Sequence, residues 1–274
     1  MKPSISIVCA TIDSPQVILD FVRRIDGALA TVHDQLSVEV LIIDQCCSDA
    51  IGQRVSAKHA EVRHFCSSIR GLSLNRNIGI RESRNEWIAF LDSDCSVSVD
   101  YFLVFLDWLR LTADVSMLVG RILSSEKQVP ILRHWSATSF FMNQLDIWKF
   151  STSVNCIYKR SAIHFFDEKL GIGAQYGSCE DVDFALSVVG LKFFTPELVV
   201  FHPEMSFSSL SDAKMYNYSR GFGALCRKRV VPLGLIVFIA SIASKFVHAL
   251  LMRISWKQFF ISTQGKISGF LYLS

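Results

Sequence analysis

Residues 5–44 read ISIVCATIDSPQVILDFVRRIDGALATVHDQLSVEVLIID, and this stretch decides the fold. Its two ends, residues 5–9 and 38–43, are short runs of mostly β-branched apolar residues bounded by polar turns, a pattern typical of buried parallel strands. Between them, apolar residues recur at three- and four-residue steps over residues 17–29, which predicts a helix with one apolar face. The stretch is therefore expected to form a βαβ unit.

The same alternation continues downstream, with a strand expected at residues 62–65, a helix at 72–83 and a strand at 87–91. This repetition predicts an α/β protein with a mostly parallel central sheet and helices on both faces. Ligands of such sheets bind beyond the carboxyl ends of the strands. The side chains that follow predicted strands, and that we expect at this edge of the sheet, are Thr11, Asp13, Asp44, Asp92 and Asp94.

The composition is that of a globular protein with a hydrophobic surplus, since 50% of the 274 residues are apolar and the formal net charge is +3. A charge this small argues against a nucleic-acid-binding protein, which normally carries a strongly basic domain. The eight cysteines include no C-x-x-C pair and a chain of this length needs no disulfide framework, so we expect reduced thiols in a cytoplasmic protein. The N-terminus enters the first strand without the apolar region of a signal peptide, which supports the same compartment.

Residues 90–94, FLDSD, carry two carboxylates separated by one residue immediately after a predicted strand. Such a pair can hold a divalent cation while the metal bridges the phosphates of a nucleotide, as in Mg²⁺ or Mn²⁺ sites. Taken alone, the motif is weak evidence and is more typical of two solvated turn acids. Its place at the same sheet edge as Asp44 favours the cation site.

Residues 177–183, GSCEDVD, place Glu180, Asp181 and Asp183 at the expected first turn of a helix. Acids in a first turn complement the helix dipole, which accounts for one or two of them. A carboxylate held near a hydroxyl can also remove its proton as a new bond forms, so a general base is the other interpretation. Cys179, like Cys95 beside Asp94, is interpreted as a small buried side chain.

Taken in order, these pieces resemble the family 2 glycosyltransferases of the GT-A fold. The resemblance is carried by residues 5–11 (ISIVCAT), 40–45 (VLIIDQ), 71–73 (GLS), 76–80 (RNIGI), 88–94 (IAFLDSD), 180–183 (EDVD) and 201–203 (FHP). Residues 218–225, YSRGFGAL, look like the ending of the branch that builds bacterial surface polysaccharides. The resemblance spans nearly the whole chain and implies a Rossmann-like nucleotide-binding half followed by a C-terminal apolar helical tail.

The resemblance also implies an activity: metal-dependent, inverting transfer of a sugar from a nucleotide diphosphate sugar to a hydroxyl of a glycan or lipid-linked acceptor, with a uridine diphosphate donor the commonest case. It makes Asp181 the general base, with Glu180 beside it and Asp183 in a supporting position. The donor is then expected to contact Thr11, Asp13, Asp44, Arg76 and Asp92. The metal, Mn²⁺ or Mg²⁺, is expected on Asp92, Asp94 and His202.

Some segments depart from the family pattern. Residues 45–47 read QCC where many members have Asp-Gly-Ser, so the nucleotide base is expected to be read differently. Leu74 and Asn75 replace a more usual Arg-Ala pair, which leaves one positive charge fewer near the donor. Residues 121–150 contain none of the motifs that carry the resemblance, and we expect them to select the acceptor. Trp135 and Trp148 in this segment are candidates either for stacking on a sugar or for the core.

We expect a glycosyltransferase domain at residues 1–225, with a nucleotide-sugar half at 1–100 and an acceptor half at 101–225, and a membrane-associating segment at 226–274. The apolar run 230–252 fits a spanning helix, an interfacial helix or a helix packed on the domain. Pro232, Gly234 and Lys245 weaken the spanning helix, so we favour peripheral attachment to the inner face of the plasma membrane.

A protein of a different class stays open as an alternative: a non-catalytic nucleotide-sugar-binding or scaffolding subunit of a polysaccharide assembly complex. Such a subunit has no need for two separate acid clusters. The presence of both Asp92 with Asp94 and Glu180 with Asp181 therefore favours the enzyme.

Overall fold

The computed structural model of the chain describes residues 2–48, 51, 55–111, 114–204 and 210–271. The chain divides into two compact units, and we name residues 1–165 with 184–205 unit 1 and residues 166–183 with 206–274 unit 2. The domain boundary that the sequence predicts after residue 225 lies within helix α7 (Asp212–Lys228). That boundary stays a prediction, and the two units are described separately.

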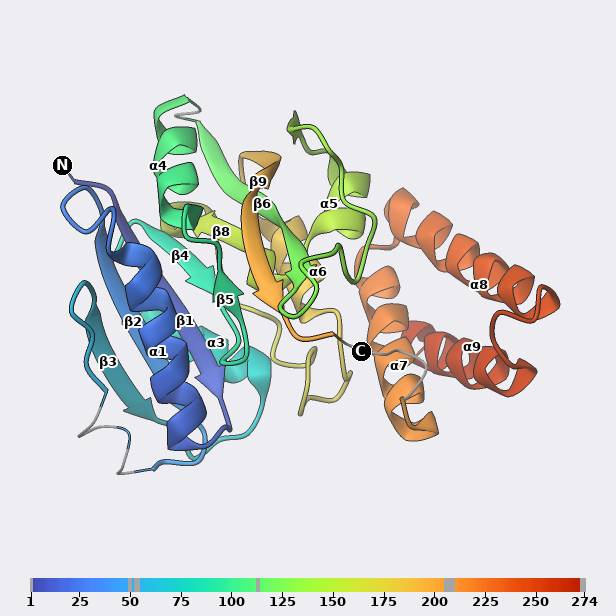
Figure 1. Cartoon of the computed structure of the whole chain (residues 1–274). Coiled ribbons are helices and arrows are strands. Elements are labelled where there is room, and N and C mark those ends of the chain that lie inside the picture. The colour runs from blue at the N-terminus through green and yellow to red at the C-terminus, as the bar shows by residue number, and fades with distance from the viewer. Residues whose placement is uncertain (1, 49–50, 52–54, 112–113, 205–209, 272–274) are drawn as a thin grey trace. The chain divides into compact units, whose positions relative to one another are not determined.

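Unit 1 is built, within the described residues, on a nine-stranded sheet with the strand order β3-β2-β1-β4-β8-β6-β9-β5, and β7 pairs with β9 outside this path (Figure 1). β1, β2, β3 and β4 pair in parallel, whereas β8 runs antiparallel to both of its neighbours and β9 runs parallel to β6. The predicted α/β class with a mostly parallel central sheet is confirmed. The strands are β1 (Ser4–Thr11), β2 (Ser37–Asp44), β3 (Glu61–Cys66), β4 (Trp87–Phe90), β5 (Ser96–Val97), β6 (Val115–Ser124), β7 (Phe140–Phe141), β8 (Cys156–Lys159) and β9 (Leu191–His202).

The helices of unit 1 bury the apolar faces that the sequence predicts. In α1, Ile18, Phe21 and Ile25 are fully buried against the sheet, and the helix begins at a proline, whose missing N–H needs no partner in a first turn. α6 starts in unit 2 and ends in unit 1. The helices are α1 (Pro15–Leu29), α3 (Leu72–Glu82), α4 (Tyr101–Leu111), α5 (Gln144–Phe150) and α6 (Glu180–Ser187), with short 3-10 turns at Ser153–Asn155 and Arg160–Ala162.

Helix α3 packs closely on β1 at Gly79. A Cβ on Gly79 would overlap Cγ1 of Val8, so any side chain pushes the helix away from the sheet. We expect Gly79→Ala to lower the free energy of unfolding by about 1–3 kcal/mol. Gly27 in α1 is the matched control, because a Cβ there meets no atom within 4 Å and alanine is favoured over glycine in a helix by about 1 kcal/mol. Urea unfolding of both variants measures the difference, and equal stability would contradict close packing at Gly79.

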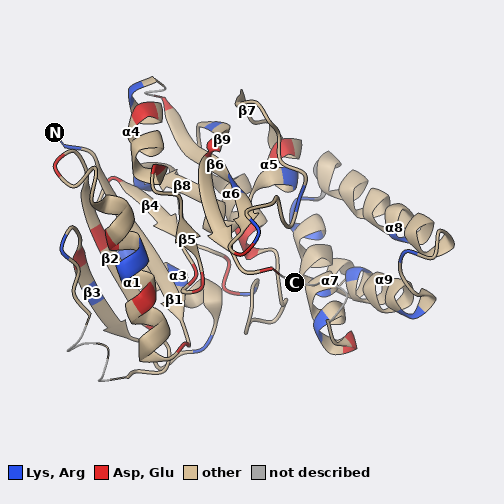
Figure 2. Cartoon of the chain, in the orientation of Figure 1, with Lys and Arg blue, Asp and Glu red and all other residues tan. Residues whose placement is uncertain are grey.

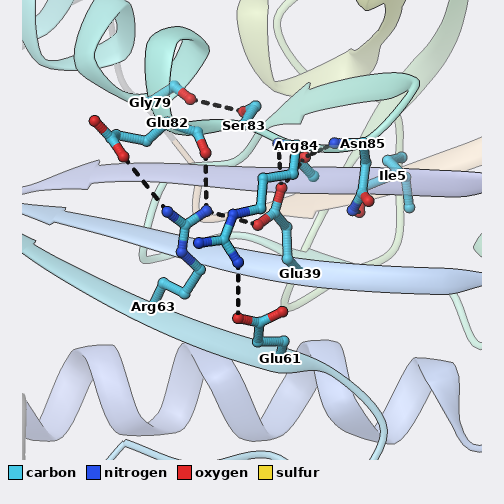
Figure 3. A network of polar contacts seen from close by, with 10 residues as sticks. Ile5, Glu39, Glu61, Arg63, Gly79, Glu82, Ser83, Arg84 and Asn85 are labelled. Carbon is cyan, nitrogen blue, oxygen red and sulfur yellow. Dashed lines mark hydrogen bonds and ion pairs between the residues drawn. The ribbon is translucent and has the colours of Figure 1, made fainter.

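A buried polar network joins the amino-terminal ends of the central strands (Figure 3). Glu39 on β2 is 3% exposed and accepts hydrogen bonds from Ser6 Oγ at 2.6 Å, from the Arg84 amide at 2.7 Å and from Arg63 at 2.9 Å. Burial alone would raise the pKa of Glu39, but the hydrogen bonds from Ser6, the Arg84 amide and Arg63 outweigh it and hold the pKa below its ordinary value. The network lies at the opposite end of the strands from Asp44 and stabilises the fold there.

The cysteines differ from the expectation of eight reduced thiols. Cys47, after β2, and Cys66, at the end of β3, form a disulfide with their Cα atoms 4.7 Å apart. The expectation was wrong for this pair because parallel pairing of β2 with β3 brings together residues 19 positions apart, which their spacing does not reveal. Cys9 and Cys95 are buried thiols, as expected, and burial raises the pKa of each well above its ordinary value.

Unit 2 consists of the loop 166–179, the first turn of α6 and the helices α7 (Asp212–Lys228), α8 (Leu235–Leu250) and α9 (Trp256–Leu271), with a π-helical turn at Val230–Gly234. α9 packs closely along α7, since a Cβ on Gly223 or on Gly269 would overlap a backbone carbonyl of the other helix. The predicted C-terminal apolar helix is confirmed as α8. The sequence did not predict its pairing with a second helix.

Candidate functional site

The Asp-Ser-Asp loop follows β4 at the carboxyl edge of the sheet in unit 1. Arg76 from α3 is 2% exposed and donates to Asp92 Oδ1 at 3.1 Å, and its guanidinium carbon lies 6.0 Å from the centre of the Phe90 ring. The Asp92 side chain remains 39% exposed. Arg76 was expected beside the donor. In the structure Arg76 contacts Asp92 and orients its carboxylate, which remains accessible to solvent.

His202, the last residue of β9, lies opposite the second acid of this loop. Its Nε2 is 3.9 Å from Asp94 Oδ1, and its Nδ1 is 2.8 Å from the carbonyl oxygen of Pro203. Because a carbonyl can only accept, Nδ1 carries a proton, and Nε2 is the ring nitrogen whose lone pair a metal ion can take. With the adjacent Cys95 sulfur, these ligand atoms all lie within 4.8 Å of one another. A carboxylate facing an imidazole lone pair fits the divalent cation that the sequence predicts.

A second set of hydrogen bonds fastens the end of β1 to the same loop. Thr11 Oγ1 lies 3.1 Å from Asp13 Oδ2 and 3.3 Å from Ser93 Oγ, and Ser93 Oγ donates to Asp13. Arg24 on α1 donates to the Ser93 carbonyl at 2.7 Å. Sequence reasoning missed Ser93 and Arg24, because a serine between two acids and an arginine on the polar face of a helix give no sign of this contact.

Asp44, at the end of β2, is fully buried. Its two carboxylate oxygens accept from the backbone amides of Cys46 and Ser48, each at 2.8 Å, and His64 Nε2 lies 3.3 Å from Oδ2. Asp44 thus shapes the loop after β2, which the disulfide at Cys47 also holds. The predicted contact of Asp44 with the donor stays a prediction.

In unit 2, Asp183 anchors the start of α6. Its carboxylate accepts from Lys228 Nζ at 2.7 Å and from Arg229 Nε at 2.9 Å, while Arg229 also donates to the Asp183 carbonyl at 3.0 Å. Asp167 in the preceding loop pairs with the same lysine at 2.6 Å. Asp183 is 4% exposed and fully committed to these contacts, so it holds the helix in place.

Asp181 has a different environment from the other acids of this cluster. Its Oδ1 accepts from the Val182 amide at 2.8 Å, and no Lys or Arg of the described chain pairs with it. Glu180 is 8% exposed, whereas Asp181 is partly accessible. Burial raises the pKa of the Cys179 thiol far above its ordinary range, which fits an inert side chain. Of the three acids, Asp181 is therefore the one that is accessible to solvent and forms no ion pair within the described residues.

A surface pocket of about 550 Å³ lies in unit 2 beside the loop that leads to these acids. Ser178 Oγ in that loop donates to the Tyr218 carbonyl at 2.8 Å, and Gly221 leaves the space that Ser178 occupies. An aromatic ring, an amide and an ammonium group facing one cleft can bind a polar organic ligand. The pocket is lined by Ile172, Gly173, Ala174, Gly177, Ser211, Ala213, Lys214, Asn217 and Tyr218.

The segment 121–150, where we expected acceptor selection, contributes the end of β6, β7 and α5 to unit 1. Trp135 packs on the core, with its ring stacked 6.4 Å from Phe194 and tilted at 6.2 Å from Phe150, and its indole N–H donates to the Ile131 carbonyl. Of the two interpretations left open for Trp135, the core position is confirmed.

Comparison with known proteins places these features in a family. Residues 6–170 match the model of Glycosyl transferase family 2. The succinoglycan biosynthesis protein ExoO of Rhizobium meliloti (strain 1021) is 38% identical over 100 residues, which cover 36% of this chain and 27% of that protein. An uncharacterized glycosyltransferase of Rickettsia felis is 34% identical over 85 residues, covering 28% of this chain and 14% of the relative. The matches thus span less than a third of the length of these relatives.

Solved structures share the fold at low sequence identity. TarS 1–349 of S. aureus has a TM-score of 0.63 and 14% identity, covering 97% of this chain and 90% of that one. The mannosyltransferase PcManGT of Pyrobaculum calidifontis, in complex with GDP-Man and Mn²⁺, has a TM-score of 0.63 and 13% identity, covering 100% and 87%. The fold that the sequence predicts is confirmed. Because the family model matches more than half of its residues, the chain belongs to glycosyl transferase family 2.

Proposed function

We propose that this glycosyltransferase moves a sugar from a nucleotide diphosphate sugar to a hydroxyl of a glycan or lipid-linked acceptor, with inversion at the anomeric carbon and with a divalent cation. The observation that carries the proposal is the pairing of Asp94 with His202 across 3.9 Å at the carboxyl edge of a family 2 sheet. Ligands of open α/β sheets bind at this edge.

Asp94, His202 and the exposed oxygen atoms of Asp92 are the proposed ligands of the cation. When bound, the cation supplies positive charge that neutralises the departing diphosphate. The protein positions this loop in advance, because Arg76 donates a hydrogen bond to Asp92 and Arg24 donates one to the Ser93 carbonyl. Groups fixed in advance need no reorganisation during the reaction. The Mn²⁺ in the structure of PcManGT supports the choice of metal.

Asp181 is the proposed general base. It takes the proton of the acceptor hydroxyl as the new C–O bond forms and the bond from the sugar to the diphosphate breaks, in a single displacement that inverts the configuration. Glu180 is proposed to assist from the adjacent position. Support comes from the order of motifs along the chain and from Asp181 being free of any ion pair in the described structure.

The acceptor is proposed to bind in the pocket of unit 2. Tyr218 offers a ring face, Asn217 hydrogen bonds, and Lys214 a charge for an anionic group on the acceptor. A place in surface polysaccharide synthesis is supported by the likeness to ExoO, a protein of succinoglycan biosynthesis. For the donor, UDP-linked sugars are the first choice, because TarS structures hold UDP-GlcNAc and UDP.

The test is calorimetric titration of the purified chain with UDP, GDP and other nucleoside diphosphates, in Mn²⁺ and then in excess chelator. We expect one nucleotide to bind with metal and to lose at least about tenfold in affinity without it, because the metal offsets the charge of the diphosphate. If a folded chain binds none of them in Mn²⁺, the donor site is overturned and the scaffolding subunit becomes the better explanation.

A further inference from the structure

The end of the chain carries a charge imbalance that the net charge of +3 conceals. Residues 213–274 hold nine of the 28 Lys and Arg residues and none of the 25 Asp and Glu residues. Figure 2 shows blue segments on the mostly tan helices α7, α8 and α9, with red at the first turn of α7, which contains Asp212. A segment with charge of one sign is attracted to a surface of the opposite sign.

Helix α8 presents apolar side chains to the outside of unit 2. A period of 3.6 residues per turn places six of them on one face. The opposite side packs on α9, where Lys266 Nζ donates to the Ser241 carbonyl at 3.0 Å and Phe238 lies 4.4 Å from Phe270. This side also contains the partly buried Lys245. The outward side chains, each 44–60% exposed, are Leu235, Ile236, Ile239, Phe246, Val247 and Leu250, and of these Phe246 also contacts the rings of Trp256 and Phe259 on α9.

The turn between α8 and α9 extends this apolar face. Leu251 and Met252 are 57% and 92% exposed, and Trp256 and Phe260 on the first turns of α9 are 46% and 63% exposed. Arg253 lies among them and is exposed as well. Aromatic and basic side chains around an apolar tip are typical of protein segments at the level of lipid headgroups.

The arrangement of α8 favours a helix lying on a membrane over a helix crossing it. Within the described residues, Pro232–Leu250 is the helix long and apolar enough to cross, with a mean hydropathy of 2.0 and 11% of that window buried. Crossing would carry Lys245 toward the hydrocarbon core, which is costly. A helix with one exposed apolar face, another face packed on protein and basic residues nearby is suited to the interface.

We propose that the outward face of α8 and the turn at residues 250–256 dock into the headgroup region of an anionic bilayer, with Arg253 near lipid phosphates. The apolar side chains enter the interface, and the basic residues of unit 2 are drawn to the negative surface. This inference does not rest on the proposed transferase reaction, because a chain without activity would bind the bilayer equally well.

The test is flotation of the full chain with vesicles of phosphatidylcholine alone and of phosphatidylcholine mixed with phosphatidylglycerol. We expect stronger binding to the mixed vesicles and a decrease at high salt, because salt screens the attraction between basic residues and lipid. Met252→Asp should lower binding by about tenfold or more, and Arg253→Gln by about fivefold.

Matched controls come from unit 1. Val99, 72% exposed, gives the control Val99→Asp for the apolar tip, and Arg23, whose side chain is 70% exposed, gives Arg23→Gln for the charge. Both should bind vesicles as the unchanged chain does. Equal binding by Met252→Asp and Val99→Asp overturns the proposal, as does a chain that binds no vesicle. If the chain binds no vesicle and light scattering shows a dimer, the apolar face of α8 would be a contact surface for a second copy of the chain.

Discussion

Replacing Asp181 by asparagine is expected to lower kcat about 10²- to 10⁴-fold, the usual contribution of a positioned general base. The amide keeps the size of the side chain and can still accept from the Val182 amide, so the local backbone should not change. What is lost is the capacity to take a proton from the acceptor hydroxyl. Donor binding should therefore be nearly unchanged. Transfer of radiolabelled sugar, with nucleotide affinity measured in parallel, separates the two effects.

Neighbouring acids provide the controls for this experiment. Asp212→Asn changes an exposed acid on α7 that pairs with Lys257, and should leave kcat unaltered. Asp183→Asn should act on stability, because the buried side chain loses its charge-assisted hydrogen bonds with Lys228 and Arg229, which are 33% and 32% exposed, a change that costs about 1.5–3 kcal/mol. Full activity of Asp181→Asn would contradict the assignment, and Glu180→Gln would then be the next variant to assay.

The second large effect is expected at the Asp94–His202 pair. Losing a residue that only orients a metal ligand costs 10- to 100-fold in metal affinity, so losing a ligand itself should cost at least about 100-fold. Asp94→Asn and His202→Ala should each weaken nucleotide binding in Mn²⁺ to the level that the unchanged chain shows in chelator. In chelator, all three proteins should bind nucleotide equally.

Two exposed residues of unit 1 provide control variants with the same amino-acid changes. Asp107 on α4 pairs with Arg110, and His134 is exposed, so Asp107→Asn and His134→Ala should leave the metal dependence of binding intact. If Asp94→Asn retained the full metal effect while the controls behaved as expected, the cation would have to be held elsewhere. Manganese bound to the protein can be counted directly by electron paramagnetic resonance, which does not depend on turnover.

Much of the fold could be predicted because its first hundred residues follow simple periodicities. The strands β1, β2 and β4 are short, mostly apolar runs, and α1 repeats its apolar residues at helical spacing. The long strands β6 and β9 were not predicted. Their pairing shifts register between Val119 and Arg121, and polar residues interrupt both strands, so no clean alternation marks them. α9 was not predicted, because glycine and serine replace apolar residues on the face that packs against α7.

The candidate site could be predicted in part, and for an identifiable reason. Asp92 and Asp94 follow a strand directly, so their place at the sheet edge is a local property of the sequence. His202 ends a strand that the periodicity did not reveal, and the resemblance to a family was what joined it to Asp94. The contacts of Arg24 with Ser93 and of Cys47 with Cys66 depend on which strands and helices become neighbours. Spacing along the chain carries no such information.

The anchoring of Asp183 by Lys228 and Arg229 has a consequence for synthesis of the chain on the ribosome. These partners are 45 and 46 positions downstream, so they are made about 2–9 seconds after the acid at ordinary elongation rates. During that interval the first turn of α6, which carries both Asp181 and Asp183, lacks the cations that pair with Asp183. A nascent chain that stalls before α7 therefore exposes this turn to proteases, and the candidate base can reach its final setting only after Arg229 has been made.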